Sequence, residues 1–231
     1  MLALLLCLSG CANLPPGKSP DPQDPYERFN RASYTFNDTV DRALLKPVAK
    51  AYEAVAPEFV RTGIANFLGN LSDIPTALND VLQGKPKQVG IHAARVAVNS
   101  TVGLLGFIDV ATPMGMARER ADFGQTLGVW GLPGGPYLVL PVFGPSSVRD
   151  TFGMTVDWAT DPLVLIPDDV ATRNTLVGVR AMDQRAALLP AERTLDAVSF
   201  DRYLLLRDAY LARRKSLVGD GAAIEPAPAS P

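Results

Sequence analysis

The stretch FGQTLGVWGLPGGPYLVLPVFGPSSV, from Phe123 to Val148, contains no charged residue. Asp122 precedes it and Arg149 follows it. An apolar run of this length is typical of a transmembrane helix. It is interrupted, however, by Gly128, Gly131, Pro133, Gly134, Gly135, Pro136, Pro141 and Pro145. Because proline lacks an amide donor and clashes with the preceding turn, the stretch cannot form one straight helix.

The composition of the whole chain leaves two settings for this apolar stretch. The chain has 231 residues, enough for one sizeable domain or two small ones. Apolar residues make up 47% of it, and its mean hydropathy is slightly positive. The net charge is only −2, which gives no electrostatic case for binding nucleic acid. The stretch could form the core of a soluble domain or lie at a membrane.

The N-terminus predicts where the protein resides. Residues 1–8 read MLALLLCL, an apolar run that is too short to cross a bilayer and that fits the central part of a signal peptide. The motif LSGC, which ends at Cys11, resembles the lipobox of bacterial lipoproteins. We therefore predict a signal peptide over residues 1–10 and lipid attachment at Cys11, with an ordinary signal peptide and an incidental cysteine as the alternative. No Lys or Arg precedes Lys18, which predicts a translation start upstream of Met1.

The segments that flank the expected domain are polar. Residues 11–24 are rich in proline and predict a flexible tether behind the lipidated cysteine. Ala12 follows Cys11, where an Asp would resemble an inner-membrane retention signal, so the outer membrane is favoured. We expect a helical domain over residues 25–216 and a disordered tail over residues 217–231.

Helical patterns dominate the domain. Helices are expected to begin at Asp24-Pro25, Pro57-Glu58 and Asp168-Asp169, and to cover residues 74–83, 86–102 and 200–215. Lys46-Pro47 is expected to kink or split the first helix, and Gly84 to end the helix over 74–83. Tyr137–Val142 is the best candidate for a strand, although Pro141 weakens it.

Two groups of charged residues each have two possible roles. Arg213, Arg214 and Lys215 are expected in the last turn of a helix, where cations oppose its negative end, with lipid binding as the alternative. Arg149 and Asp150 are expected to form an internal ion pair, with a pore-lining role as the alternative.

The sequence offers little for catalysis. Its single histidine, His92, lies between apolar residues on a predicted helix and is interpreted as a packed, hydrogen-bonded side chain. The sequence contains no nucleophile elbow and no cluster with metal-ligand spacing. The glycines at 128, 131 and 134 do not match the dinucleotide fingerprint. We therefore predict no enzyme activity, no catalytic residue, no metal and no cofactor.

Short motifs occur in a fixed order along residues 24–211. They are DPYERFNR at 24–31, FN at 36–37, NFLGNL at 66–71, LQG at 82–84, NSTVG at 99–103, GFID at 106–109, DFGQTLG at 122–128, GPYLVLP at 135–141, GPS at 144–146 and RD at 149–150. With these motifs the chain resembles the MlaA (VacJ) family of phospholipid-transport lipoproteins of the Gram-negative outer membrane.

The resemblance implies a fold and a function. The fold is an all-α ring, embedded in the inner leaflet of the outer membrane, with Gly/Pro-rich broken segments around a central pore. Phospholipids that have strayed into the outer leaflet pass through the pore to a periplasmic carrier of the MlaC type, and from there to an inner-membrane transporter. The ring lies beside a trimeric porin, and neither covalent chemistry nor nucleic acid is involved.

The resemblance also suggests residues of the lipid path. Residues 111–122 become a mobile loop beside the pore, in which Arg118 and Arg120 could contact phosphate groups. A solvated surface loop is the alternative.

Four residues of the uncharged stretch are candidates for the pore or lipid path: Phe123, Leu127, Trp130 and Tyr137. The polar tips of Trp130 and Tyr137 suit the boundary of a leaflet.

Two other functions stay open at this stage. The protein could be a structural lipoprotein that accompanies a porin and moves no lipid. It could also be a periplasmic lipid hydrolase, for which His92 is the only histidine available as a base.

Overall fold

The computed structural model of the chain describes residues 21–192 and 201–219. Its elements are α1 (Glu27–Val40), the π-helical turn η2 (Asp41–Leu45), α2 (Lys46–Val55), α3 (Glu58–Leu82), α4 (Pro86–Thr101), α5 (Phe123–Val129), β1 (Tyr137–Leu140), β2 (Gly144–Ser147), α6 (Val148–Ala159), α7 (Pro162–Leu165), α8 (Val170–Ala187) and α10 (Arg202–Val218). The described chain is mostly helical, as predicted. The predicted signal peptide, Cys11 and residues 220–231 of the predicted tail lie outside the described residues.

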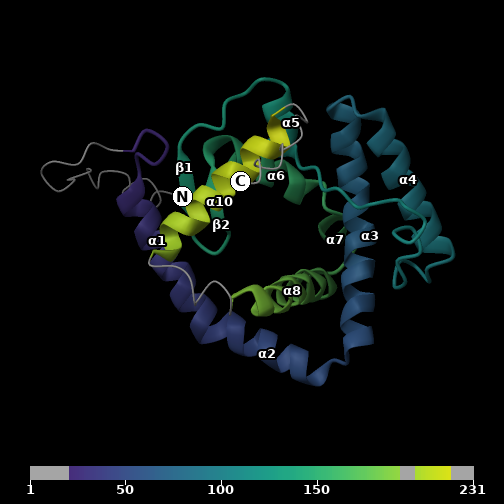
Figure 1. Cartoon of the computed structure of the whole chain (residues 1–231). Helices are drawn as coiled ribbons and strands as arrows, with labels where there is room; N and C mark the ends of the chain where they lie inside the picture. The colour runs from purple at the N-terminus through teal and green to yellow at the C-terminus, as the bar shows by residue number, and fades with distance from the viewer. Residues whose placement is uncertain (1–20, 193–200, 220–231) are drawn as a thin grey trace, which may run out of the picture.

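The helices run round the molecule in a ring-like order (Figure 1). α1, η2 and α2 form a continuous curved arm, which leads to the long helix α3 on the opposite side, with α4 packed against it. The hairpin of β1 and β2, together with α5, α6 and α10, occupies the side between α1 and α3. α8 packs on α2, so segments far apart in the sequence lie side by side.

The first helix begins later than predicted. α1 starts at Glu27, and Asp24 does not cap it. The buried Asp24 carboxylate instead accepts hydrogen bonds from Asn30 Nδ2 (2.8 Å) and from the Tyr203 hydroxyl. The end of the predicted tether is therefore packed into the domain, and the prediction of a helix start at Asp24-Pro25 is wrong.

Two prolines in helices have different consequences. Before Pro47 the helix widens into η2, in which the Lys46 N–H donates to Asp41 O. Of the two predicted effects of Lys46-Pro47, a split does not occur: α1 continues through η2 into α2 as a curved arm (Figure 1). Pro75, by contrast, lies inside the unbroken helix α3. The prediction of a separate helix over 74–83 is therefore wrong, because α3 continues through the missing donor.

The end of α3 follows the predicted pattern. Gly84 adopts a φ of 68° and donates to Val81 O (3.1 Å), and Lys85 N–H donates to Asp80 O (2.9 Å). These are the two hydrogen bonds of a Schellman motif, so the predicted role of Gly84 is confirmed.

The uncharged stretch 123–148 folds into short elements rather than one helix, as predicted. Asp122 caps α5, since its carboxylate accepts from Gln125 N (2.8 Å). β1 confirms the first four residues of the predicted strand 137–142. A second strand, β2, was not predicted; it pairs with β1 in antiparallel register, Tyr137 opposite Ser147.

Two close contacts hold this region together. α5 crosses α6 at glycines: a Cβ on Gly153 would lie 2.4 Å from Gly124 N, so the two backbones touch. α10 packs on β1 through aromatic rings, with the Tyr203 and Tyr137 ring centroids 6.4 Å apart and those of Tyr137 and Tyr210 5.7 Å apart. The C-terminal helix is thereby fixed against the hairpin.

α8 starts where the sequence predicts. The carboxylate of Asp169 accepts from Thr172 N (2.7 Å) as the N-cap. The prediction of a helix start at Asp168-Asp169 is confirmed.

Candidate functional site: a polar cleft behind an apolar face

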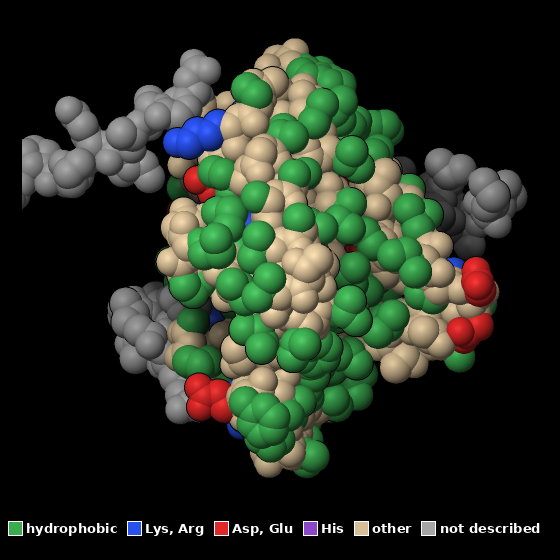
Figure 2. All heavy atoms as spheres, turned by 90° about the vertical axis from the view of Figure 1, so that its right-hand side faces the viewer, with side chains coloured by type: hydrophobic (Ala, Val, Ile, Leu, Met, Phe, Trp, Pro, Cys, Tyr) green, Lys and Arg blue, Asp and Glu red, His purple; other side chains and the backbone are tan. Residues whose placement is uncertain are grey.

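The helical hairpin of α3 and α4 buries polar residues and exposes apolar ones. Buried polar residues of this hairpin are Asn70, Asp73, Thr76, Asn79, Asp80, His92, Arg95 and Asn99. Exposed apolar residues on α3 are Phe59, Ile74, Leu78, Val81 and Leu82. Figure 2 shows that on this side of the molecule hydrophobic side chains are spread widely and charged ones lie at the margins. The arrangement is the reverse of a helix on a water-soluble protein.

Arg95 is at the centre of the polar interior. Its fully buried guanidinium contacts Asp73 (Nε to Oδ2, 3.2 Å), Asp109 (Nη2 to Oδ2, 3.1 Å), Thr112 Oγ1 (3.0 Å) and the carbonyl oxygen of Met116. Burial acts to raise the pKa of Asp109, but hydrogen bonds from Thr112 and Arg95 outweigh it and hold the pKa well below its usual value.

His92 is also part of this interior. It is fully buried, with Nδ1 2.7 Å from Asp80 Oδ2. Its buried Nε2 has no hydrogen-bond partner among the described residues. The interpretation of His92 as a packed, hydrogen-bonded residue is confirmed.

A polar cleft lies between α3, α5, the start of α4 and the C-terminal part of α10. It consists of a cavity of about 1180 Å³ and a second of about 390 Å³. Residues that line both are Arg120, Ala121, Gln125, Arg213 and Leu217. We call these two adjoining cavities together the polar cleft.

Cations predominate in the larger cavity. Its charged lining residues are Lys85, Lys87, Arg118, Arg120 and Arg213, against Asp80 and Glu119. Arg118 is held by Asp73, with Nε 3.0 Å from Oδ1. Within residues 21–192 and 201–219, Lys85, Lys87, Arg120 and Arg213 form no ion pair. An anionic group that enters the cleft therefore meets cations whose charge is not already compensated.

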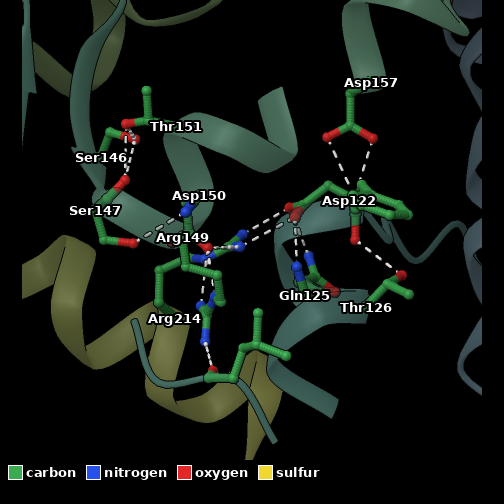
Figure 3. Close-up of polar contacts among 12 residues, drawn as sticks. Asp122, Gln125, Thr126, Ser146, Ser147, Arg149, Asp150, Thr151, Asp157 and Arg214 are labelled. Carbon is green, nitrogen blue, oxygen red and sulfur yellow. Dashed lines mark hydrogen bonds and ion pairs between the residues drawn. The ribbon is translucent and has the colours of Figure 1, made fainter. Parts of the chain in front are cut away.

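The smaller cavity is bordered by an ion-pair network (Figure 3). Arg214 on α10 contacts Asp122 at the start of α5 (2.6 Å) and Asp150 on α6 (2.7 Å). Asp150 also accepts from Arg149 (2.8 Å), so the predicted internal pair is confirmed, and from the Tyr210 hydroxyl (2.5 Å). Burial raises the pKa of Asp150, but the bonds from Tyr210 and Arg214 have the larger combined effect and lower it.

The network corrects the interpretation of the basic run on α10. Lys215 lies in the last turn of the helix, as expected. Arg214 turns instead to Asp122 and Asp150, and Arg213 lines the polar cleft. The prediction that all three cations serve the helix end is therefore wrong for the two arginines.

Asp157 is a carboxylate in the smaller cavity without an ion pair in the described part of the chain. It accepts from Phe123 N (3.0 and 3.2 Å to its two oxygens). Burial raises its pKa from 3.8 to about 6, and the neighbouring Asp122 adds to the shift. Ionised Asp157 therefore opposes folding near neutral pH.

The effect of Asp157 on stability depends on pH. Between about pH 4 and pH 6 the folded protein holds this proton more tightly than the unfolded chain does, so stability falls as the pH rises through that window. We expect Asp157→Asn to raise the free energy of unfolding at pH 7 by about 1 kcal/mol, because solvent screening reduces the effect of a partly exposed carboxyl. The gain should shrink as the pH falls towards 4 in unfolding experiments over a pH series. The control Asp161→Asn should instead lose stability at pH 7, since Asp161 pairs with Arg180 at 2.5 Å. An equal effect of Asp157→Asn at both ends of the pH series would contradict this assignment.

The predicted site residues fall into two groups. Arg118 and Arg120 both line the polar cleft, together with Glu119 and Ala121. Trp130 is 52% exposed and lies in edge contact with Phe123, with ring centroids 6.1 Å apart. Leu127 and Tyr137 are only 7% and 1% exposed. The expected position of Tyr137 at a leaflet boundary is therefore wrong, because its ring packs against α10.

Several cleft residues were missed by the sequence analysis. Lys85 and Lys87 flank the proline that opens α4, and Arg213 had been explained by the helix end. Asp157 carried no local signal. These residues meet Arg118 and Arg120 only through tertiary packing.

Among residues 21–192 and 201–219, no helix has both the length and the apolar character needed to cross a membrane. In the same residues, no group of three or more His, Cys, Asp and Glu side chains could hold a metal ion.

Comparison with known proteins agrees with the sequence motifs. The family model described as MlaA lipoprotein matches residues 22–217. The chain is 35% identical over 214 residues to the intermembrane phospholipid transport system lipoprotein MlaA of Escherichia coli K12, covering 88% of this chain and 81% of that protein. It is 32% identical over 233 residues to the protein of the same name from Haemophilus influenzae, covering 95% and 89%.

A solved structure is also similar. It comes from work on the structural basis for maintenance of bacterial outer membrane lipid asymmetry, and it matches with a TM-score of 0.73 and 35% identity over 84% of this chain and 98% of that one. The predicted family resemblance is confirmed, and this chain belongs to the MlaA lipoprotein family.

Proposed function

We propose that the protein removes mislocalised phospholipids from the outer leaflet of the outer membrane and passes them to a periplasmic carrier, which maintains the lipid asymmetry of that membrane. One observation carries the proposal: a cleft lined by uncompensated cations lies behind helices whose outer face is apolar. A phospholipid has the matching division into an anionic head group and apolar chains. The names of the relatives, which are intermembrane phospholipid transport lipoproteins, support the same function.

The position proposed for the protein is inside one leaflet rather than across the bilayer. The apolar outer face of α3 and α4 suits contact with acyl chains, and their polar interior is shielded by the helices themselves. Non-helical backbone at membrane depth must be packed in protein or face an aqueous cavity, and the short elements of 123–148 pack on α6 and α10. The ring is proposed to surround a pore of which the polar cleft is one wall.

Head groups are proposed to follow the polar cleft. Guanidinium groups bind phosphate oxygens through paired N–H donors, and Arg120 and Arg213 are exposed in both cavities. Arg118 is positioned by Asp73 and contributes charge to the larger cavity. The exposed Trp130 donates from Nε1 to Leu82 O at the end of α3 (3.0 Å), whereas Leu127 is buried on α5.

The proposed setting is the periplasmic side of the outer membrane, with lipid on Cys11. The proposed partners are a trimeric porin beside the ring and a carrier of the MlaC type that receives the lipid. We infer that no covalent step is involved, since His92 is buried against Asp80 and is not placed to activate a nucleophile at the cleft surface. A structural lipoprotein beside the porin is the remaining alternative.

Lipid transfer separates these functions. The full-length lipidated protein, placed in vesicles that contain labelled phospholipid, is expected to load the purified periplasmic carrier with intact phospholipid above the protein-free background. Mass spectrometry of the carrier measures this. A structural lipoprotein would leave the carrier empty, and a hydrolase would yield lysophospholipid or free fatty acid.

The anchor is tested separately. Cys11→Ser, expressed with a complete signal peptide, is expected to be unlipidated and to be depleted from the outer-membrane fraction, because the acyl chains add to the attachment that the apolar faces of the domain provide. Cell fractionation and detection of the acylated N-terminus measure this. A Cys11→Ser protein that fractionates like the wild type would show that the anchor is not needed for its location.

A further inference from the structure

The turn that follows α4 presents bulky apolar side chains outward. Leu104 and Leu105 are 67% and 70% exposed. Both have a left-handed backbone, with φ of 50° and 60°. We call residues 103–108 the apolar turn.

A left-handed backbone is unfavourable for leucine, by about 1–2 kcal/mol per residue, whereas glycine and asparagine adopt it readily. The glycines on either side of the two leucines fix this left-handed backbone by close packing. A Cβ on Gly103 would lie 2.2 Å from Ile108 O, and one on Gly106, whose φ is 94°, would lie 2.7 Å from Asn70 Cβ. The fold thus holds two leucines in a strained conformation at the surface, where in water they gain nothing from burial.

Most backbone N–H groups of the apolar turn are hydrogen-bonded within the turn or to the end of α4. Leu105 N donates to Ser100 O (3.2 Å), Gly106 N to Asn99 O (2.8 Å) and Ile108 N to Gly103 O (2.9 Å). The carbonyl oxygen of Phe107 accepts from Asn66 Nδ2 (3.1 Å). Asn99 Oδ1 accepts from the N–H groups of the next two residues, 110 and 111 (2.9 and 3.0 Å). An irregular loop in water does not need such closure, whereas one in hydrocarbon does.

Charge is also absent from the outside of the apolar turn. Asp109 is the only charged residue between positions 96 and 117, and its carboxylate turns inward to Arg95 and Asn99. Val102, Phe107 and Ile108 add exposed apolar surface beside the leucines. This surface belongs to the hairpin of α3 and α4, whose outer face is apolar (Figure 2).

We infer that the apolar turn inserts into the acyl-chain layer of the bilayer and sets the depth of the α3–α4 hairpin in it. Contact with hydrocarbon stabilises two exposed leucines, and hydrocarbon offers no hydrogen-bond partners, so the surface placed in it must not need them. A protein–protein interface normally has a polar rim, and the turn has no charged groups on its outside to form one. The inference rests on the proposed embedding of the protein in a leaflet.

A nitroxide label tests the surrounding of the turn. Leu105→Cys is labelled in the full-length protein, in vesicles of phosphatidylethanolamine and phosphatidylglycerol. The two native cysteines do not compete, since Cys7 lies in the predicted signal peptide and Cys11 carries the predicted lipid. We expect loss of relaxation by an aqueous nickel chelate and strong relaxation by oxygen, compared with a label at Thr175→Cys, an exposed position on α8.

The outcomes at position 105 are distinct. A label that meets the nickel chelate as readily as the one at Thr175 places the turn in water and overturns the inference. A label shielded from both reagents places it against protein, which in these vesicles is a second copy of the chain, and also overturns it.

A second arm asks whether the leucines cause the insertion. With the label moved to Ile108→Cys, the pair Leu104→Asn and Leu105→Asn should restore access of the nickel chelate, whereas the pair Leu104→Met and Leu105→Met should not. Asparagine tolerates the left-handed backbone, so the unfolding midpoint in detergent should stay the same or rise. A folded Asn pair whose label stays in hydrocarbon overturns the role of the leucines.

Lipid transfer to the carrier is measured on the same vesicles, which keeps the two proposals separate. A protein that transfers phospholipid while its label at 105 lies in water retains the proposed function and loses the inference. A protein with the label in hydrocarbon and no transfer retains the inference and loses the function.

Discussion

We expect Arg95→Ala to lower the free energy of unfolding by about 3–5 kcal/mol, because it leaves the partly buried Asp109 without a cation and the buried Asp73 with one cation instead of two. Arg95 is fully buried and contacts Asp73 and Asp109 at once. Without it, Asp73 keeps its ion pair with Arg118, and Asp109 keeps hydrogen bonds to Asn99 and Thr112. The measurement is thermal or denaturant unfolding of the protein in detergent, followed by circular dichroism.

A matched substitution controls for the loss of an arginine as such. Arg42 is an exposed arginine on η2 that pairs with Asp38 four residues earlier, and such pairs contribute about 0.3–0.5 kcal/mol. Arg42→Ala should therefore have a small effect. Arg95→Lys should lie between the two alanine variants, because it keeps the charge and loses the fork of donors. If Arg95→Ala is no worse than Arg42→Ala, the polar interior of the hairpin does not contribute to stability in the way its geometry indicates.

Much of the fold follows from prolines and glycines that can be located in the sequence. Pro47 marks a π-helical turn and Gly84 a helix end that the structure contains. Pro75 misled the sequence analysis, because a proline is compatible with a long helix when its neighbours pack it. The strand β2 was missed because the sequence GPSS has neither alternation nor β-branched residues, and only its pairing with β1 makes it a strand.

The two faces of the α3–α4 hairpin, one polar and one apolar, are visible in the sequence. On α3, polar residues recur at helical spacing as Asn70, Asp73 and Asp80, while Ile74, Leu78 and Val81 fall on the other side. This pattern shows two faces, but it does not show which one is buried. The family resemblance led to Arg118 and Arg120, whereas the cleft residues on α4 and α10 could be found only once tertiary packing had brought three elements together.

The second large prediction concerns two neighbouring arginines on α10, because one of them contributes to the stability of the fold and the other to the polar cleft. Arg214 is largely buried and joins α10 to Asp122 and Asp150, whereas Arg213 is exposed in the polar cleft and forms no ion pair within the described residues. We expect Arg214→Gln to lower the free energy of unfolding by about 2–3 kcal/mol, since it removes charge-assisted hydrogen bonds and leaves two carboxylates facing each other. Arg213→Gln should change it by less than about 0.5 kcal/mol, as is usual for a surface substitution.

In lipid transfer, unlike in stability, Arg213→Gln should show a clear defect. At equal amounts of folded protein in the vesicles, Arg213→Gln should load less phospholipid onto the carrier, because the cleft loses a cation that faces the head group. The charge-matched control is Lys50→Gln on α2, an exposed position outside the polar cleft, which should transfer at the wild-type rate. An Arg213→Gln protein that transfers as well as Lys50→Gln does would remove the cleft from the lipid path. If Arg214→Gln is as stable as Arg213→Gln, the ion-pair network does not hold α10 in place, and α10 can move relative to the other elements that line the polar cleft.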